Sequence, residues 1–220
     1  MKTFPMITIS RQYGTSGHKI SELLAKKLEL PFYDKELISI ASKESRFGEK
    51  AFEAAEETAT TTLGYALSNR SNRSLYGMPL NDQLFMVQAG VIRTVADQGP
   101  ALFVGRCADY VLDGYKETIK IFLQASTEAR IKTVMERENL SRRDAEARIK
   151  RLDKSRATYY NYYTDRKWSD LKNYDIVLNV SYLTPEEVAD LLCTFIRQVV
   201  EKTGAIDAEA QERKSGQSNT

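Results

Sequence analysis

Short apolar runs alternate with amphipathic segments along most of the chain. Short runs rich in apolar, aromatic or β-branched residues predict strands at residues 6–9, 31–33, 101–104, 119–123 and 175–180. Between them, apolar positions three and four apart predict helices, as at residues 20–28. This alternation predicts an α/β fold, a five-stranded parallel sheet with helices on both faces. Ligands of such sheets lie beyond the carboxyl ends of the strands.

The remaining segments complete one domain over residues 1–202. Helices are predicted over residues 35–45, 83–97 and 141–163, and Ser126 and Thr184 are placed to cap two more, the second with Pro185 at its first position. Residues 47–79 have no clear hydrophobic periodicity. We expect either a helical or looped insertion that covers a site, or a flexible surface loop. From residue 203 the chain is polar and rich in small residues, which predicts a disordered tail.

Composition narrows the class of protein. Hydrophobic residues make up 42% and charged residues 28%, a normal balance for a soluble globular domain, and the net charge of +2 does not indicate a polyanion-binding protein. The spacing of Cys107 and Cys193 fits no metal motif, so two reduced, buried thiols are expected. No apolar run suits a signal peptide or a membrane span, so we expect a cytoplasmic protein without membrane partners.

The turn after the first strand is a candidate phosphate-binding loop. Residues 10–17 join a predicted strand to a predicted helix, and Gly14 and Gly17 allow the backbone to approach an anion closely. A helix that begins beside such a loop presents backbone N–H groups and a favourable dipole to phosphate. The alternative is that the two glycines only make a tight turn between strand and helix.

The loop departs from the usual pattern G-x-x-x-x-G-K-[ST]. Aligning Ser16 with its second glycine puts Gly17 at the lysine position and His18 where a magnesium-binding hydroxyl is expected. Lys19 comes two positions late, about 200° further round a helix, and is no simple substitute. His18 either bonds a phosphate oxygen or is an exposed residue without function. The candidates for binding nucleotide phosphates are Arg11, Gly14, Thr15, Ser16, Gly17, His18 and Lys19.

Several segments, in order, resemble the divergent cytidylate kinase-like branch of the cytidylate kinase family. ITISRQYGTSG at residues 7–17 resembles its opening strand and loop, and PFYDKELI at residues 31–38 its next element. FVGR at residues 103–106, IKIFLQAS at 119–126 and the following Arg130 are similar to its central strand, Gly-Arg turn and next strand and helix. Asp153-x-x-Arg156 resembles the end of its lid. The similarity covers about residues 6–195.

The resemblance implies a P-loop-type nucleoside monophosphate kinase with three layers, an insertion at about 47–79 and a helical lid at about 141–168. The implied reaction moves the γ-phosphoryl group of ATP, with Mg²⁺, to a nucleoside monophosphate, with CMP or dCMP expected. Asp34 and Arg106 would bind the acceptor, and Asp153 and Arg156 would act at the transfer site. Cys107 replaces the aspartate that usually follows Gly-Arg in this family, so the base of the acceptor nucleotide stays open.

The charged segment before the last predicted strand is the expected lid. On composition alone, interleaved acidic residues favour a solvated helix with surface ion pairs. Phosphoryl transfer, however, uses mobile arginines that close over the transferred group. We therefore expect Arg148 and Arg156 to contact phosphate, with Arg151 as the next candidate. A packed aromatic seam against the sheet, rather than nucleic-acid stacking, is expected from Tyr159, Tyr160, Tyr162, Tyr163 and Trp168.

Two other functions remain open from the sequence. The missing loop lysine favours a nucleotide-binding regulator with little catalysis. Cys107 favours a kinase of another small metabolite. In each case the expected partners are small molecules, with no nucleic acid, and the oligomeric state stays open.

Overall fold

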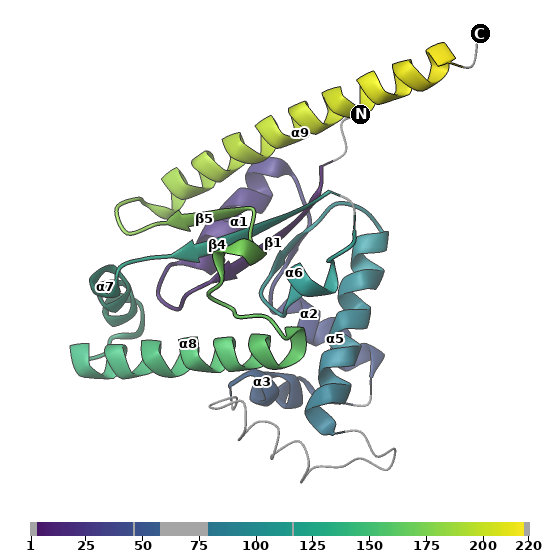
Figure 1. The fold of residues 1–220 in the computed structure, drawn as a ribbon. Coiled ribbons are helices and arrows are strands. Elements are labelled where there is room, and N and C mark those ends of the chain that lie inside the picture. The colour runs from purple at the N-terminus through teal and green to yellow at the C-terminus, as the bar shows by residue number, and fades with distance from the viewer. Residues whose placement is uncertain (1–3, 46, 58–78, 116, 218–220) are drawn as a thin grey trace.

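The computed structural model describes residues 4–45, 47–57, 79–115 and 117–217. Five parallel strands form one sheet in the order β2-β3-β1-β4-β5, with helices on both faces (Figure 1). The strands are β1 Met6–Arg11, β2 Phe32–Tyr33, β3 Leu102–Val104, β4 Thr118–Gln124 and β5 Ile176–Asn179. The predicted five-stranded α/β fold is confirmed.

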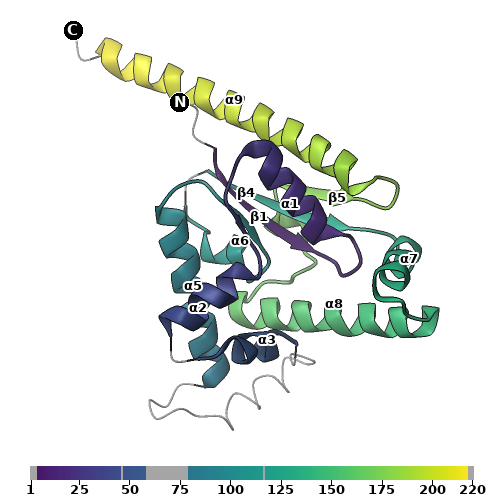
Figure 2. The same cartoon turned by 180° about the vertical axis from the view of Figure 1, so that it is seen from behind.

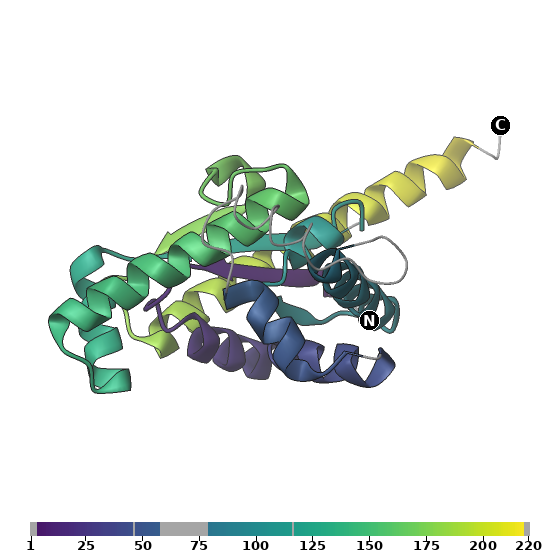
Figure 3. The same cartoon turned by 90° about the horizontal axis from the view of Figure 1, so that it is seen from below.

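The helices are α1 Gly17–Leu28, α2 Glu36–Glu44, α3 Glu49–Glu57, α5 Leu80–Asp97, α6 Ala108–Val111, α7 Thr127–Glu138, α8 Arg142–Thr164 and α9 Pro185–Gln217, with a 3₁₀ turn at Leu171–Asn173. The helices predicted over residues 20–28, 35–45, 83–97 and 141–163 are present with ends within about three residues, whereas α3 and α6 were not predicted. Helices α1 and α9 cover one face of the sheet, whereas α5, α6 and α8 lie on the other (Figures 2 and 3).

Alternation of side chains along the strands sets these two layers. In β3, Leu102 and Val104 join the apolar cluster formed with α1 and α9, while Phe103 between them joins the cluster formed with α2, α5 and α6. In β4, Ile121 faces the first layer and Phe122 packs among aromatic residues on the second. Strands buried on both faces therefore appear in the sequence as unbroken apolar runs.

The predicted helix caps are present. The Ser126 hydroxyl accepts a hydrogen bond from the Ala129 backbone N–H at 3.3 Å, at the start of α7. At the start of α9, Thr184 accepts from the Glu187 N–H at 3.3 Å, and the Glu187 carboxylate accepts from the Thr184 N–H at 2.8 Å. This reciprocal pair is a capping box, which satisfies two N–H groups that the helix leaves without partners.

Helix α9 continues to Gln217 (Figure 1), past residue 203, where the sequence predicted the start of a disordered tail. Alanine, glutamate, glutamine and lysine, frequent in this segment, are good helix formers, so a polar composition alone did not exclude a helix. Of the expected insertion, α3 and residue 79 are described, and residues 58–78 lie outside the described part.

Both cysteines are buried and unpaired, as expected. No described helix is long and apolar enough to cross a membrane.

The expected aromatic seam fixes the second half of α8 to the body of the domain. Phe122 on β4 contacts the rings of Trp168 and Tyr174, with centroids 5.3 and 4.8 Å apart. Tyr163 stacks on Phe85 of α5 at 4.0 Å. The predicted packing is confirmed, and the end of the lid helix forms a fixed wall beside the sheet.

Candidate functional site

A cavity of about 370 Å³ opens at the carboxyl ends of β1 and β3, where ligands of parallel sheets bind. Its walls come from the end of β1, the turn after β3, helices α2 and α3, and the lid helix α8. The volume lies in the range of roughly 300–1,000 Å³ typical of small-molecule sites. Among the described residues, its charged lining is Arg11, Lys35, Arg106, Arg148 and Arg156 against Asp34 and Glu53. This excess of cations suits an anionic ligand.

Arg11, the last residue of β1, lies at the centre of this charge. Its guanidinium lies directly against Gly105, because a Cβ added there would collide with the guanidinium nitrogen. Gly105 also has a φ of +72°, a backbone conformation that residues other than glycine rarely adopt. The Arg11 guanidinium is 3.7 Å from the Asp34 carboxylate, whose other oxygen is 2.7 Å from His18 Nδ1.

Electrostatics in the cavity favour a bound anion. Burial, and next the charge of Arg11, lower the pKa of Arg106 to about 10 and the pKa of Arg156 to about 9. Burial also lowers the pKa of Arg11 itself, with Asp34 opposing the shift. Each lowered pKa means that the folded protein disfavours the charged guanidinium. A phosphate among these groups would offset their mutual repulsion.

Asp34 stays ionised in this setting. Its burial acts to raise the pKa, but the charge of Arg11, the hydrogen bond from His18 and the charge of Arg106 lower it by more, so the pKa lies below its ordinary value. A carboxylate of lowered pKa is a poor proton acceptor. Asp34 is therefore suited to orient cations or hydrogen-bond donors.

Lid residues meet the loop beside the cavity. Arg156 donates a hydrogen bond to the Arg11 carbonyl at 2.9 Å and lies 5.4 Å from the ring centroid of Tyr13. Asp153 does not line the cavity; its carboxylate accepts from the Tyr13 backbone N–H at 2.7 Å and forms an ion pair with Arg130. Asp153 thus holds the lid helix on the loop.

A family comparison now adds to this geometry. The model of the cytidylate kinase-like family matches residues 6–182. The chain belongs to the cytidylate kinase-like family. The match includes the loop, the cavity and the whole lid helix.

Curated relatives agree over shorter stretches. A cytidylate kinase of Methanopyrus kandleri is 30% identical over 118 residues, 50% of this chain and 61% of the relative. One of Sulfolobus acidocaldarius is 32% identical over 74 residues, 34% of this chain and 41% of the relative. The alignments thus span less than two thirds of these curated relatives.

Solved structures support the fold. An uncharacterized protein of Eubacterium ventriosum is 24% identical with a TM-score of 0.65, covering 88% of this chain and 98% of that one. Shikimate kinase of Bacteroides thetaiotaomicron is 12% identical with a TM-score of 0.52, covering 90% and 99%. At these identities the likeness concerns the fold alone.

In this cytidylate kinase-like chain the loop backbone is shaped closely by its neighbours. Gly14 has a φ of +87°, and a Cβ there would lie 2.9 Å from the Arg130 backbone oxygen. Thr15 is buried and donates its hydroxyl to the Gln12 carbonyl at 2.9 Å. Ser16 has a φ of 56° and precedes Gly17, the first residue of α1.

Two charged candidates of the loop, His18 and Lys19, lie outside the cavity lining. Among the described residues, positions 14–19 are not part of that lining. Lys19 is exposed and pairs with Glu22 on α1 at 3.3 Å, which agrees with the expectation that it is no simple substitute for the loop lysine. His18 is also largely exposed and reaches the cavity only through Asp34. Of the loop candidates, Arg11 brings its charge into the cavity.

The candidate lid arginines differ in whether they line the cavity. Arg148 lines the cavity, and its Nε is 2.5 Å from the carboxylate of Glu138. Arg151 is exposed and is not part of the lining among the described residues. Tyr13, Lys35 and Glu53 also line the cavity, although the sequence did not mark them as site residues. Lys35 directly follows Asp34, which the sequence did mark, whereas Glu53 lies in the segment without a clear hydrophobic periodicity.

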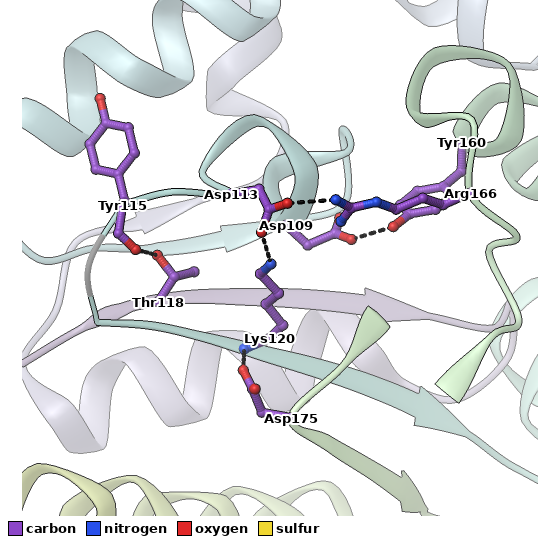
Figure 4. A network of polar contacts seen from close by, with 8 residues as sticks. All are labelled: Asp109, Asp113, Tyr115, Thr118, Lys120, Tyr160, Arg166 and Asp175. Carbon is purple, nitrogen blue, oxygen red and sulfur yellow. Dashed lines mark hydrogen bonds and ion pairs between the residues drawn. The ribbon is translucent and has the colours of Figure 1, made fainter. Parts of the chain in front are cut away.

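A polar network anchors the far end of the lid of this family member (Figure 4). The Tyr160 hydroxyl donates to the buried Asp109 at 2.7 Å. Arg166, just beyond α8, donates to Asp113 at 2.5 Å, and the Lys120 ammonium donates to the other Asp113 oxygen at 2.5 Å. The cavity wall is therefore tied to α6 and β4.

Two carboxylates of this network predict opposite pH effects. Burial raises the pKa of Asp109 despite the Tyr160 hydrogen bond, so stability is lost as pH rises from about 3.8 through the folded-state pKa. Hydrogen bonds from Lys120 and Arg166 lower the pKa of Asp113, so stability is lost as pH falls through its folded-state pKa. Asp109→Asn is expected to stabilise the protein at pH 8 and Asp113→Asn to destabilise it. The Asp109 difference shrinks as pH falls towards about 3.8, whereas the Asp113 difference shrinks only as pH falls below about 3.8.

Urea unfolding at pH 8 and at lower pH measures both variants against wild type. The two variants serve as controls for each other, because both replace a carboxylate of one network by an amide. If both variants changed the free energy of unfolding in the same direction at pH 8, the opposite roles assigned to Asp109 and Asp113 would be wrong.

Proposed function

We propose that this protein transfers the γ-phosphoryl group of ATP to a nucleoside monophosphate, with CMP or dCMP as the expected acceptor. One observation carries the proposal: Arg11, Arg106, Arg148 and Arg156 come from three separate parts of the fold and line one cavity. Phosphoryl transfer depends mainly on positioning and on neutralising charge on the transferred group. Membership of the cytidylate kinase-like family supports the same reaction class.

The geometry suggests roles for the charged residues. Arg11 joins the loop, the expected donor side, to the cavity, while Asp34 and Arg106 face the expected acceptor side. Arg148 and Arg156 extend from the lid and would neutralise the transferred group. No proton acceptor is required, because a monophosphate with a second pKa of about 6 is already largely a dianion at pH 8. An ionised Asp34 fits that scheme.

The described residues fit the phosphates of ATP better than a metal held by protein ligands alone. Arginines around the cavity match phosphate oxygens in charge and geometry. The described residues contain no cluster of three His, Cys, Asp or Glu side chains placed to hold a metal ion. Mg²⁺ commonly binds through one or two carboxylates, waters and the substrate phosphates. Asp34 is the buried carboxylate available for that role, and the ion would neutralise phosphate charge.

Two observations keep alternative functions in view. Lys19 pairs with Glu22 outside the cavity, so the loop supplies no lysine, which favours a nucleotide-binding regulator. Cys107 lines the cavity at the position after Gly-Arg, which favours an acceptor other than a cytidine nucleotide.

The deciding experiment measures ADP release from ATP and Mg²⁺ with CMP, dCMP, UMP, AMP or GMP as acceptor. We expect turnover with CMP or dCMP well above the ATPase rate without acceptor. Nucleotide binding by calorimetry, without turnover for any acceptor, would instead favour the regulator. Turnover with a different monophosphate would keep the phosphotransferase and overturn the acceptor.

A further inference from the structure

Tyr13 connects the loop after β1 to helices α7 and α8. Its ring packs against the apolar cluster of α7 and α8 and lies 4.9 Å from the Arg137 guanidinium and 5.4 Å from that of Arg156. Its hydroxyl donates to the carboxylate of Glu138, the last residue of α7. The loop thereby fixes the position of this carboxylate.

Glu138 in turn holds a lid arginine. Its second oxygen is 2.5 Å from Arg148 Nε, and the same nitrogen is 3.4 Å from the Tyr13 hydroxyl. Arg148 also lines the cavity, so the same residue contacts a protein carboxylate and borders the space for a ligand. The Glu138 side chain is 19% exposed and that of Arg148 is 44% exposed, so water reaches this ion pair in part.

Glu138 is an anion at neutral pH. Burial acts to raise its pKa, but hydrogen bonds from Tyr13 and Arg137 and the charge of Arg148 lower it by more, so the pKa lies below its ordinary value. Carboxylate and phosphate bind guanidinium in the same bidentate manner. Both would compete for the same guanidinium.

We propose that Tyr13 and Glu138 are positioning residues that hold Arg148 beside the cavity, and that a phosphate ligand which binds Arg148 through its Nε has to displace Glu138. The proposal rests on the proposed function, in which Arg148 contacts phosphate. The contact keeps Arg148 within reach of the site, and the competition weakens the binding of anions.

The test measures pyrophosphate binding by calorimetry, without any turnover. Glu138→Gln removes the competing charge at nearly constant shape, and we expect binding about two- to fivefold tighter, the range for a partly exposed ion pair. Tyr13→Phe keeps the ring and removes the hydroxyl, and a smaller gain is expected. Glu136→Gln, an exposed glutamate on the same helix, controls for the general loss of negative charge.

The double variant Glu138→Gln/Arg148→Gln separates this contact from long-range electrostatics. We expect Glu138→Gln to have no effect on pyrophosphate binding once Arg148 is replaced. Equal effects in both backgrounds, or a gain in Glu136→Gln as large as in Glu138→Gln, would overturn the proposal, as would unchanged or weaker binding in a folded Glu138→Gln protein. Because pyrophosphate binding needs no catalysis, failure of the proposed phosphotransfer would show separately in the ADP assay.

Discussion

Replacing Arg156 with glutamine is expected to lower kcat/KM for phosphoryl transfer by about 10³-fold, the scale of an arginine that neutralises the transferred group. Arg156 lines the cavity and is held by the Arg11 carbonyl at 2.9 Å and by the ring of Tyr13. Its fixed position means that little ordering is needed when phosphate binds. Initial rates of ADP release with the preferred acceptor give the measurement.

Arg142→Gln is the matched control, because Arg142 lies on the same helix and is exposed in ion pairs with Glu128 and Glu146. Its activity is expected to stay within about twofold of wild type, since exposed ion pairs contribute little. A comparable loss in both variants would assign the effect to the general charge of the lid.

Thermal unfolding distinguishes a functional arginine from a structural one. The lowered pKa of Arg156, about 9, means that the folded state disfavours its charge, and that penalty is fully present at pH 7 and relieved as pH rises through 9. Arg156→Gln removes this penalty and also the hydrogen bond to the Arg11 carbonyl, so it should unfold at a temperature close to that of wild type. Added pyrophosphate should stabilise wild type more than the variant. A large loss of stability in the variant would indicate that Arg156 mainly supports the fold.

The order and type of elements were predictable because buried parallel strands are short and strongly apolar. Residues 101–104 contain no polar position, since Leu102 and Val104 face one helical layer and Phe103 the other. The end of α9 was not predictable from polarity, because a helix needs helix-forming residues and does not need an apolar stripe along its full length.

The site was predictable where side-chain direction follows from position in an element. Arg11 ends a central strand and therefore enters the space beyond its carboxyl end, whereas Lys19 lies on the outer side of α1. The roles of Tyr13 and Glu138 had no local signal, because their contact joins positions 125 residues apart. Asp153 was expected at the transfer site for the same reason: its contact with the loop joins residues far apart in the sequence, so no local signal showed that it lies outside the cavity.

Gly14→Ala is expected to lower the free energy of unfolding by about 2–4 kcal/mol, combining a strained backbone with a steric clash. Gly14 has a φ of +87°, and an added Cβ would lie 2.9 Å from both the Cβ and the backbone oxygen of Arg130. A backbone atom and a Cβ cannot move aside as a flexible side chain can. Arg130 also holds Asp153, so the shift would reach the contact between lid and loop.

Gly90→Ala provides the control for this substitution. Gly90 lies inside α5, and a Cβ there meets nothing within 4 Å. Alanine should therefore raise the free energy of unfolding by about 0.5–1 kcal/mol, the difference in helix propensity. Urea unfolding of the two variants separates the explanations: opposite signs are expected because one glycine supports a left-handed loop position and the other only interrupts a helix. Equal changes would mean that the loop can accept a side chain, and its close packing on α7 could then not be what shapes the phosphate-binding turn.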